Sequence, residues 1–233
     1  PQHVWARNGT AGNVTLREIL EYGDGGSADQ DSRKREEQAQ QNRLGRLHRH
    51  YDEAGLLTFD GYDFKGNVIE KARQVIADGP VSAAMTTAAS TESIPAFQVD
   101  WQLGVLLDNA RYQTSVTYDA LNRIKTMCYP EDVEGRRRLL HPHYNRAGAL
   151  AGVTLDGETY VSHIAYNAKG QRTLIVYGNG VMTRYAYDPQ TFRLVRLRTE
   201  RFTLTGPYTY RPSGGLLQDF AYDYDLVGNI LKI

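Results

Sequence analysis

The stretch YNAKGQRTLIVYGNGVMTRYAY, residues 166–187, decides the predicted fold. Two segments with alternating side chains flank the glycines around Asn179, and Asn-Gly in that position is the strongest short signal for a β-hairpin. The stretch opens with Tyr166 and Asn167 and closes at Tyr187. Asn167 can accept a hydrogen bond from the backbone N–H two residues on, and Gly170 tolerates the positive φ that closes such a turn. The stretch therefore predicts one β-hairpin between two chain reversals of the same kind.

The same unit recurs along the chain as Tyr, then Asp or Asn, two free positions, and Gly or Asn. The copies at Tyr144, Tyr166 and Tyr187 lie 22 and 21 residues apart, which leaves room for two short strands and a second turn per unit. We expect the tyrosines to be cross-strand rungs and the other residues to form turns, in an antiparallel meander. The predicted structural repeat residues are Tyr51, Asp52, Gly55, Tyr62, Asp63, Gly66, Tyr118, Asp119, Asn122, Tyr144, Asn145, Gly148, Tyr166, Asn167, Gly170, Tyr187, Asp188, Tyr224, Asp225 and Gly228.

The remaining segments are less regular than the repeat. A polar run after Ser32 predicts one short exposed helix near 32–44, because Glu, Gln, Arg, Lys and Ala are good helix formers. Residues 200–216, rich in Gly, Pro and Tyr, predict an insertion that lengthens the hairpin before the last copy. The expected organisation is N-terminal strands with a polar loop and helix over 1–46, first hairpins over 47–76, an irregular connection over 77–98, and a repeat sheet over 99–233 that continues beyond the chain end.

Composition narrows the class of protein. Tyrosines number 16 against 6 phenylalanines, which suits strands with one wet face. Lys+Arg and Asp+Glu both number 27, so the charge disfavours a nucleic-acid partner. A single cysteine, Cys128, excludes an internal disulfide and a zinc site built on several thiolates. We expect no membrane insertion by this chain and no signal peptide in it, because it lacks a long apolar run and a basic-then-apolar start.

Longer strings extend the match beyond the short unit. They are RLHRHYDEAGLLTFDGYDFKGNVIEKARQ (46–74), YNAKGQRTLIVYGNGVMTRYAYDPQTFRLVRLRT (166–199) and LQDFAYDYDLVGNI (217–230). Together with the Tyr-Asp units, the sequence resembles Rhs/YD-repeat proteins, and specifically the Rhs-like region of bacterial insecticidal toxin-complex B (and B/C) components. The resemblance covers most of the chain after about residue 43.

The resemblance implies an extended, twisted or spiralling antiparallel sheet that is part of a hollow shell around a toxin polypeptide. It implies a structural, non-enzymatic function in virulence, in a complex that is secreted or extracellular. The implied partners are other parts of the same shell and an enclosed effector polypeptide, with no cofactor. The self-cleaving core region and the effector domain of the family have no counterpart in these residues.

Other functions remain open on the residues alone. An aromatic-rich sheet can serve as a carbohydrate- or protein-binding β module. A weaker alternative is a carboxylate-dependent hydrolase, since Asp223 and Asp225 stand two residues apart as a glycosidase pair could. The pairs His48/His50 and His141/His143 would each share a strand face, as two-ligand metal arms do, but no conventional metal motif accompanies them. We therefore assign no catalytic, cofactor-binding or metal-ligating residue.

Overall fold

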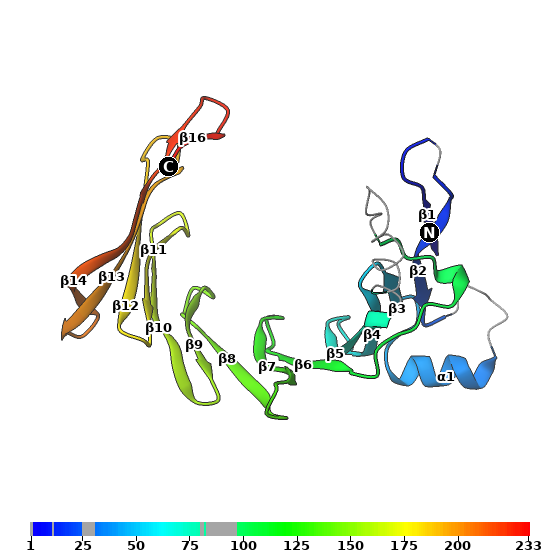
Figure 1. The fold of residues 1–233 in the computed structure, drawn as a ribbon. Helices are drawn as coiled ribbons and strands as arrows, with labels where there is room; N and C mark the ends of the chain where they lie inside the picture. Colours follow the sequence, from blue (N-terminus) through cyan, green and yellow to red (C-terminus); the bar gives the residue numbers. More distant parts are fainter. Residues whose placement is uncertain (1, 11, 25–30, 80–81, 83–96) are drawn as a thin grey trace. The chain divides into compact units, whose positions relative to one another are not determined.

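The computed structural model describes residues 2–10, 12–24, 31–79, 82 and 97–233 (Figure 1). The chain divides into two compact units, residues 1–138 and 139–233. Most of the expected irregular connection over 77–98 lies outside the described residues.

In the described part of the first unit, the named elements are strands β1 to β7, the start of β8, and two short helices. Its helices are α1 (Ser32–Gln40) and the 3₁₀ helix η1 (Trp101–Leu103). Its strands are β1 (His3–Ala6), β2 (Thr15–Tyr22), β3 (Leu47–Asp52), β4 (Gly55–Tyr62), β5 (Val68–Val75), β6 (Tyr112–Tyr118), β7 (Ile124–Glu131) and the start of β8 (Arg137–Tyr144).

The second unit is built from strands among the residues described. They are the rest of β8, then β9 (Leu150–Leu155), β10 (Glu158–Tyr166), β11 (Arg172–Tyr177), β12 (Val181–Tyr187), β13 (Leu194–Gly206), β14 (Thr209–Ala221), β15 (Asp223–Tyr224) and β16 (Ile230–Lys232).

Strand order follows chain order. Strands β1 to β14 form one 14-stranded sheet in sequence order, and β15 pairs with β16 in a separate ribbon. Every pairing for which a register is defined is antiparallel, as in β11 with β12 and β9 with β10. The β9–β10 turn has positive φ at both Asp156 (51°) and Gly157 (85°), the two-residue geometry that matches strand twist. The predicted all-β fold of antiparallel hairpins with one short helix is confirmed.

The helix α1 is shorter than the predicted span of 32–44. Asp31 caps it by accepting a hydrogen bond from the Arg33 backbone N–H at 3.1 Å, and it ends at Gln40. None of its residues is buried. Among the described residues, no helix is long and apolar enough to cross a membrane.

Buried side chains in the first unit lie on the strands and beside η1. Asp100 accepts a hydrogen bond from the Leu16 backbone N–H at 3.2 Å, which ties η1 to β2. The Trp101 ring contacts Tyr51 edge-on with 5.0 Å between centroids. The buried apolar residues here are Leu16, Leu56, Tyr62, Ala72, Ile76, Val99 and Val116.

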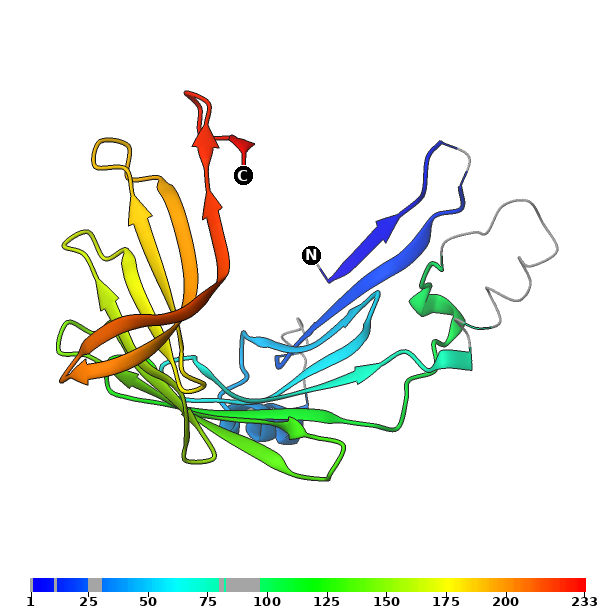
Figure 2. The same cartoon turned by 60° about the vertical axis from the view of Figure 1, so that its left-hand side comes forward.

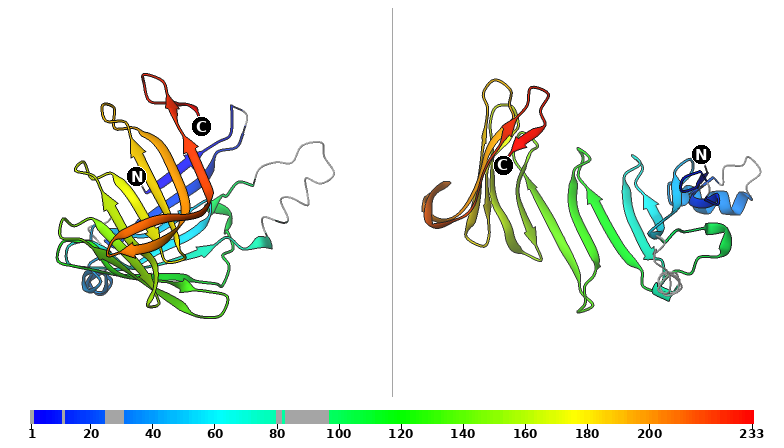
Figure 3. Two further views of the ribbon diagram at one scale, coloured as in Figure 1. Left: turned by 90° about the vertical axis from the view of Figure 1, so that its left-hand side faces the viewer. Right: turned by 45° about the horizontal axis from the view of Figure 1, so that its top comes forward.

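In the second unit, the long β13–β14 hairpin folds back over its neighbours. Each of its strands has 13 residues, as the predicted insertion over 200–216 requires (Figures 2 and 3). Near its tip, Tyr208 and Tyr210 lie 5.2 and 6.0 Å from the ring of His163 on β10. His163 pairs with Val176, which is completely buried together with Met182. The tip therefore reaches the sheet face that carries Val176 and Met182.

Candidate functional site: the tyrosine turns

Five turns of the chain share one set of hydrogen bonds. In the Asn167 turn, Oδ1 accepts from the backbone N–H groups of Lys169 and Gln171, each at 3.0 Å. The Asn167 N–H donates to the Gln171 carbonyl at 2.9 Å, and Gly170, at φ 77°, donates to the Asn167 carbonyl at 3.0 Å. The same pattern recurs at Asp63, Asp119, Asp132 and Asn145.

Two turns vary this pattern. Asp188 accepts from the N–H groups of Gln190 and Thr191, and the extra residue places Phe192 at φ 60°. Asp225 accepts from Gly228 and Asn229. In both, one carboxylate oxygen accepts from two backbone N–H groups of its own turn.

Five repeat tyrosines connect their turn to an earlier strand. Each hydroxyl donates to the carbonyl of a strand's first residue, and that strand starts directly after the preceding turn. We call these five residues the tyrosine ladder. The bonds are Tyr62 to Leu47 (2.5 Å), Tyr118 to Val68 (3.0 Å), Tyr166 to Leu150 (2.8 Å), Tyr187 to Arg172 (2.9 Å) and Tyr224 to Leu194 (2.7 Å).

At Asn67, Gln171 and Arg193, the residue before the strand start adds a second link between neighbouring turns. Asn67 donates its side-chain N–H to the Asn122 Oδ1 atom at 3.2 Å, and Gln171 donates to the Phe192 carbonyl at 2.8 Å. Arg193 donates to the Asp225 carbonyl at 2.6 Å. Sequence reasoning missed these residues; a signal for Asn67 and Gln171 is the polar side chain directly after the repeat glycine.

The turn of the Tyr51-Asp52 copy lies at the opposite end of the strands from the turn that follows Tyr62. Tyr51 is on β3 and Tyr62 ends β4, so the two turns stand at opposite ends of antiparallel strands. Asp52 pairs directly with Gly55 in a two-residue loop, and its carboxylate receives two hydrogen bonds from Arg73, at 2.7 and 2.8 Å. Tyr144 ends β8 and pairs with Leu150, the first residue of the next strand. The ladder tyrosines likewise pair with the first residue of the strand that follows them.

Asp132 forms a full turn of the repeat kind that the Tyr-Asx pattern does not detect. Glu131 stands where the other units have Tyr, although Gly135 has the expected positive φ of 73°. The sequence signal that detects this turn is the string Asp-x-x-Gly-Arg. Its arginine is the polar residue that follows the glycine.

The turn carboxylates are held ionised. Hydrogen bonds from the Arg123 backbone and side chain lower the pKa of Asp119, and those from Asn229 and Gly228 lower the pKa of Asp225. An Asp whose pKa lies below its usual range is a poor proton donor at neutral pH. These carboxylates therefore act as fixed acceptors.

The histidine pairs engage ordinary neighbours. His50 lies 3.0 Å from Glu18, and His143 lies 3.3 Å from the Thr154 hydroxyl. Burial and then the charges of Arg43 and Arg49 lower the pKa of His48 to about 4, so it is neutral at neutral pH. Within the described ranges, no three His, Cys, Asp or Glu side chains are grouped as a metal site. Asp223 lies in β15 and Asp225 in the turn that follows.

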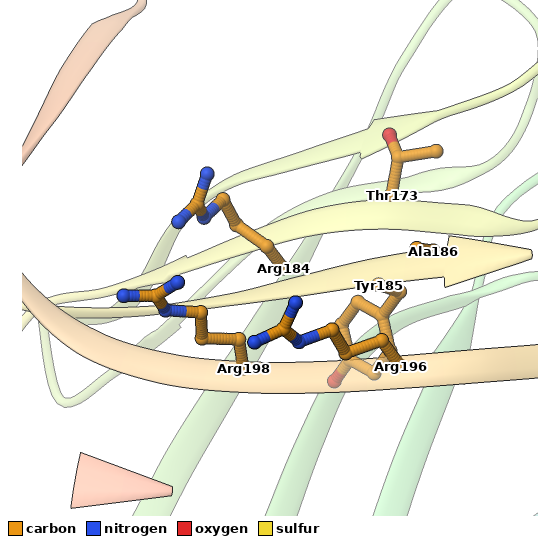
Figure 4. A pocket seen from close by; sticks show the side chains of 6 residues that line it. All are labelled: Thr173, Arg184, Tyr185, Ala186, Arg196 and Arg198. Atoms are coloured by element: carbon orange, nitrogen blue, oxygen red, sulfur yellow. The ribbon is translucent and has the colours of Figure 1, made fainter. Parts of the chain in front are cut away.

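A recess of about 330 Å³ on β12 and β13 gathers three arginines (Figure 4). Arg184 forms an ion pair with Glu200, whose side chain is only 4% exposed, and Arg198 approaches the same carboxylate at 3.3 Å. Arg196 makes two hydrogen bonds to Asp219 on β14, at 2.8 and 2.7 Å. The Arg184–Glu200 pair joins β12 to β13 and the Arg196–Asp219 pair joins β13 to β14, so these two pairs reinforce the pairing of the three strands.

Comparisons with known proteins agree with this geometry. No family model matches the chain. Toxin subunits YenC2 and YenC1 of Yersinia entomophaga are 28% identical over 203 residues and 29% identical over 194 residues. Each match covers 82% of this chain but only 19% and 18% of the relative, so the chain spans about a fifth of their length.

Solved structures of toxin complexes match nearly the whole chain. A structure of TcdB2-TccC3-Cdc42 and one of the Photorhabdus luminescens Tc holotoxin pore each give a TM-score of 0.61 at 26% identity. Both matches cover 98% of this chain and 9% of the other. In sequence and in structure, the chain is thus similar to subunits of toxin complexes, as the resemblance to their Rhs-like region predicts.

Proposed function

We propose that the chain is a segment of a wall that encloses a toxin or effector polypeptide. The observation that carries this proposal is the tyrosine ladder: in successive hairpins a tyrosine hydroxyl ties the end of the second strand to the start of the first, and a side chain such as Gln171 links neighbouring turns. A hydrogen bond from a side chain to a backbone carbonyl contributes about 0.5–1.5 kcal/mol, and the bond is repeated along the sheet. The likeness to toxin subunits supports a wall in a toxin complex.

Enclosure has a physical benefit for the guest. Exposed strand edges and apolar segments of an unfolded polypeptide pair with other chains, and a closed wall prevents those encounters. Other parts of the same shell would complete the wall, in a complex that is secreted by a bacterium and contributes to virulence. The proposed role is non-enzymatic, because the carboxylates of the repeat serve as turn acceptors and arginine partners.

A protease-protection assay tests the proposal. The natural complex that carries this chain is isolated and treated with trypsin, and its polypeptides are followed by mass spectrometry. We expect one enclosed polypeptide to resist digestion in the intact complex and to be digested when Gly55→Val opens the wall. Equal digestion of every polypeptide in the intact complex would refute enclosure.

The same preparation separates the rival functions. A binding module would retain defined sugars on a glycan array, and a hydrolase would release reducing ends from them. Neither result is expected from a wall.

A further inference from the structure

We infer that residues 22–47 are another copy of the turn unit, in which an inserted segment carrying α1 has replaced the short turn. The first support is the register. Tyr22 pairs with Leu47 as Tyr187 pairs with Leu194. The Gly23 N–H donates to the Arg46 carbonyl at 2.9 Å, which matches the bond from the Asp188 N–H to the Arg193 carbonyl, also 2.9 Å.

The second support is the set of contacts made by the last residue before the strand, which is an arginine in both units. Arg46 lies over the Tyr62 ring, 5.4 Å from its centroid, and donates to the Asp63 carbonyl at 3.3 Å. Arg193 lies over the Tyr224 ring at 5.7 Å, and donates to the Asp225 carbonyl. The two arginines thus stack on a ladder tyrosine and bind the residue that follows it.

The third support is the glycine of the next turn. A Cβ atom added at Gly66 would lie 3.1 Å from the Arg46 Nη2 atom, and one added at Gly228 would lie 3.2 Å from the Arg193 Nη2 atom. In both places the arginine fills the space that the missing side chain leaves. The agreement of register, stacking and close approach identifies Arg46 as the counterpart of Arg193.

The inserted segment is an accessory on the sheet. A nine-residue helix that is polar on all sides is too short to be stable alone and buries nothing for the core. Its hold on the sheet comes after the helix, where the Gln41 carbonyl accepts from the Tyr62 N–H and Asn42 donates to the Tyr62 carbonyl. Figures 1 and 3 show α1 beside the strands of the first unit. The helix is therefore available for contacts outside the sheet.

A graft tests this equivalence in the full chain. Residues 23–46 are replaced by the sequence of residues 188–193, which supplies both the turn carboxylate and the final arginine. We expect the melting temperature to stay within about 4 °C of the original, because the shorter loop offsets the lost contacts of residues 41–43. A linker of six Gly and Ser residues is the matched control, and it should melt about 4 °C or more below the graft. A graft that melts no higher than this linker overturns the inference.

A matched pair of substitutions tests the equivalence of Arg46 and Arg193 a second time, without shortening the chain. Arg46→Ala and Arg193→Ala should lower the melting temperature by similar amounts, about 2–4 °C each. An effect at only one position contradicts the equivalence. The inference rests on the proposed wall for its purpose, but these melting experiments do not: protease protection tests the wall, whereas the graft tests this copy alone.

Discussion

Two turns that begin with the same Tyr-Asp pair and have the same spacing to glycine close in different ways. In Asp52-Glu53-Ala54-Gly55 the glycine already pairs with the aspartate, whereas in Asp63-Phe64-Lys65-Gly66 the turn closes one residue later, at Asn67. The residue after glycine differs. Leu56 is buried and must enter a strand facing the core, but Asn67 donates its N–H and its side-chain amide to Asp63. The Tyr-Asp pair indicates a chain reversal, and in these two copies the residue after glycine is what distinguishes the two kinds of turn.

The largest expected effect comes from Gly55→Ala. Gly55 has φ +132°, and its added Cβ would lie 2.2 Å from the Gln74 carbonyl oxygen, so the backbone of β5 must move. We expect the free energy of unfolding to fall by about 3 kcal/mol or more in urea titrations. Gly157→Ala is the control, since φ is also positive but the added Cβ meets no atom within 4 Å; it should cost only about 1 kcal/mol. Equal losses of unfolding free energy in the two variants would mean that the close contact between Gly55 and β5 is not what makes the Asp52 turn sensitive to substitution.

A smaller loss is expected from Gly170→Val in a turn of the other kind. Its φ of +77° is strained for a β-branched residue, although space is open around it, so we expect about 1–3 kcal/mol of destabilisation. Ala168→Val, in the same turn and exposed, should leave the melting curve nearly unchanged. Unchanged melting of the Gly170 variant would argue against its turn role.

Replacing the turn carboxylate by an amide should affect the stability of the protein differently at Asp52 and at Asp63. Asp63→Asn keeps the acceptor oxygen, as the native Asn145 and Asn167 turns do, so little change is expected. Asp52→Asn loses the paired bonds from Arg73, and we expect a loss of about 1 kcal/mol in urea titrations. Similar losses at both positions would show that the ion pair is unimportant.

The pH dependence of stability sharpens this contrast. Burial raises the pKa of Asp52, but hydrogen bonds from Arg73 and the Ala54 N–H outweigh it and hold the pKa below its usual range. Because the folded pKa lies below the unfolded value of about 4, the stabilisation is present above pH 4 and is lost as the pH falls through the folded pKa. Melting between pH 5 and pH 2 should therefore drop less steeply for Asp52→Asn than for the unchanged chain.

The smallest expected effect is that of one ladder hydroxyl. Tyr187→Phe removes the bond to the Arg172 carbonyl and keeps the ring, so a loss of about 0.5–1.5 kcal/mol is expected. Tyr160→Phe, on a side chain that is 54% exposed, is the control and should have no effect. If Tyr187→Phe and Tyr160→Phe had the same stability, the hydroxyl bond of Tyr187 would not contribute to the stability of the repeat.

The local part of this structure could be predicted from sequence, because turns are decided by neighbouring residues. Asn179-Gly180 and Asp156-Gly157 indicate their hairpins directly, and the fold class follows from their repetition. The acceptors of the tyrosine hydroxyls could not be predicted, because they depend on which strand lies beside each turn. The role of Arg46 was hidden for a related reason: its partner Gly23 stands on the far side of an inserted helix.

The ladder bonds also bear on how the protein is made. Tyr62, Tyr166 and Tyr187 reach back only 15, 16 and 15 residues along the chain. Contacts this local form quickly, and a nascent chain leaves the ribosome N-terminus first. Each of these bonds lies within one hairpin, so a newly emerged hairpin can close its own ladder bond during translation, before the next hairpin leaves the ribosome.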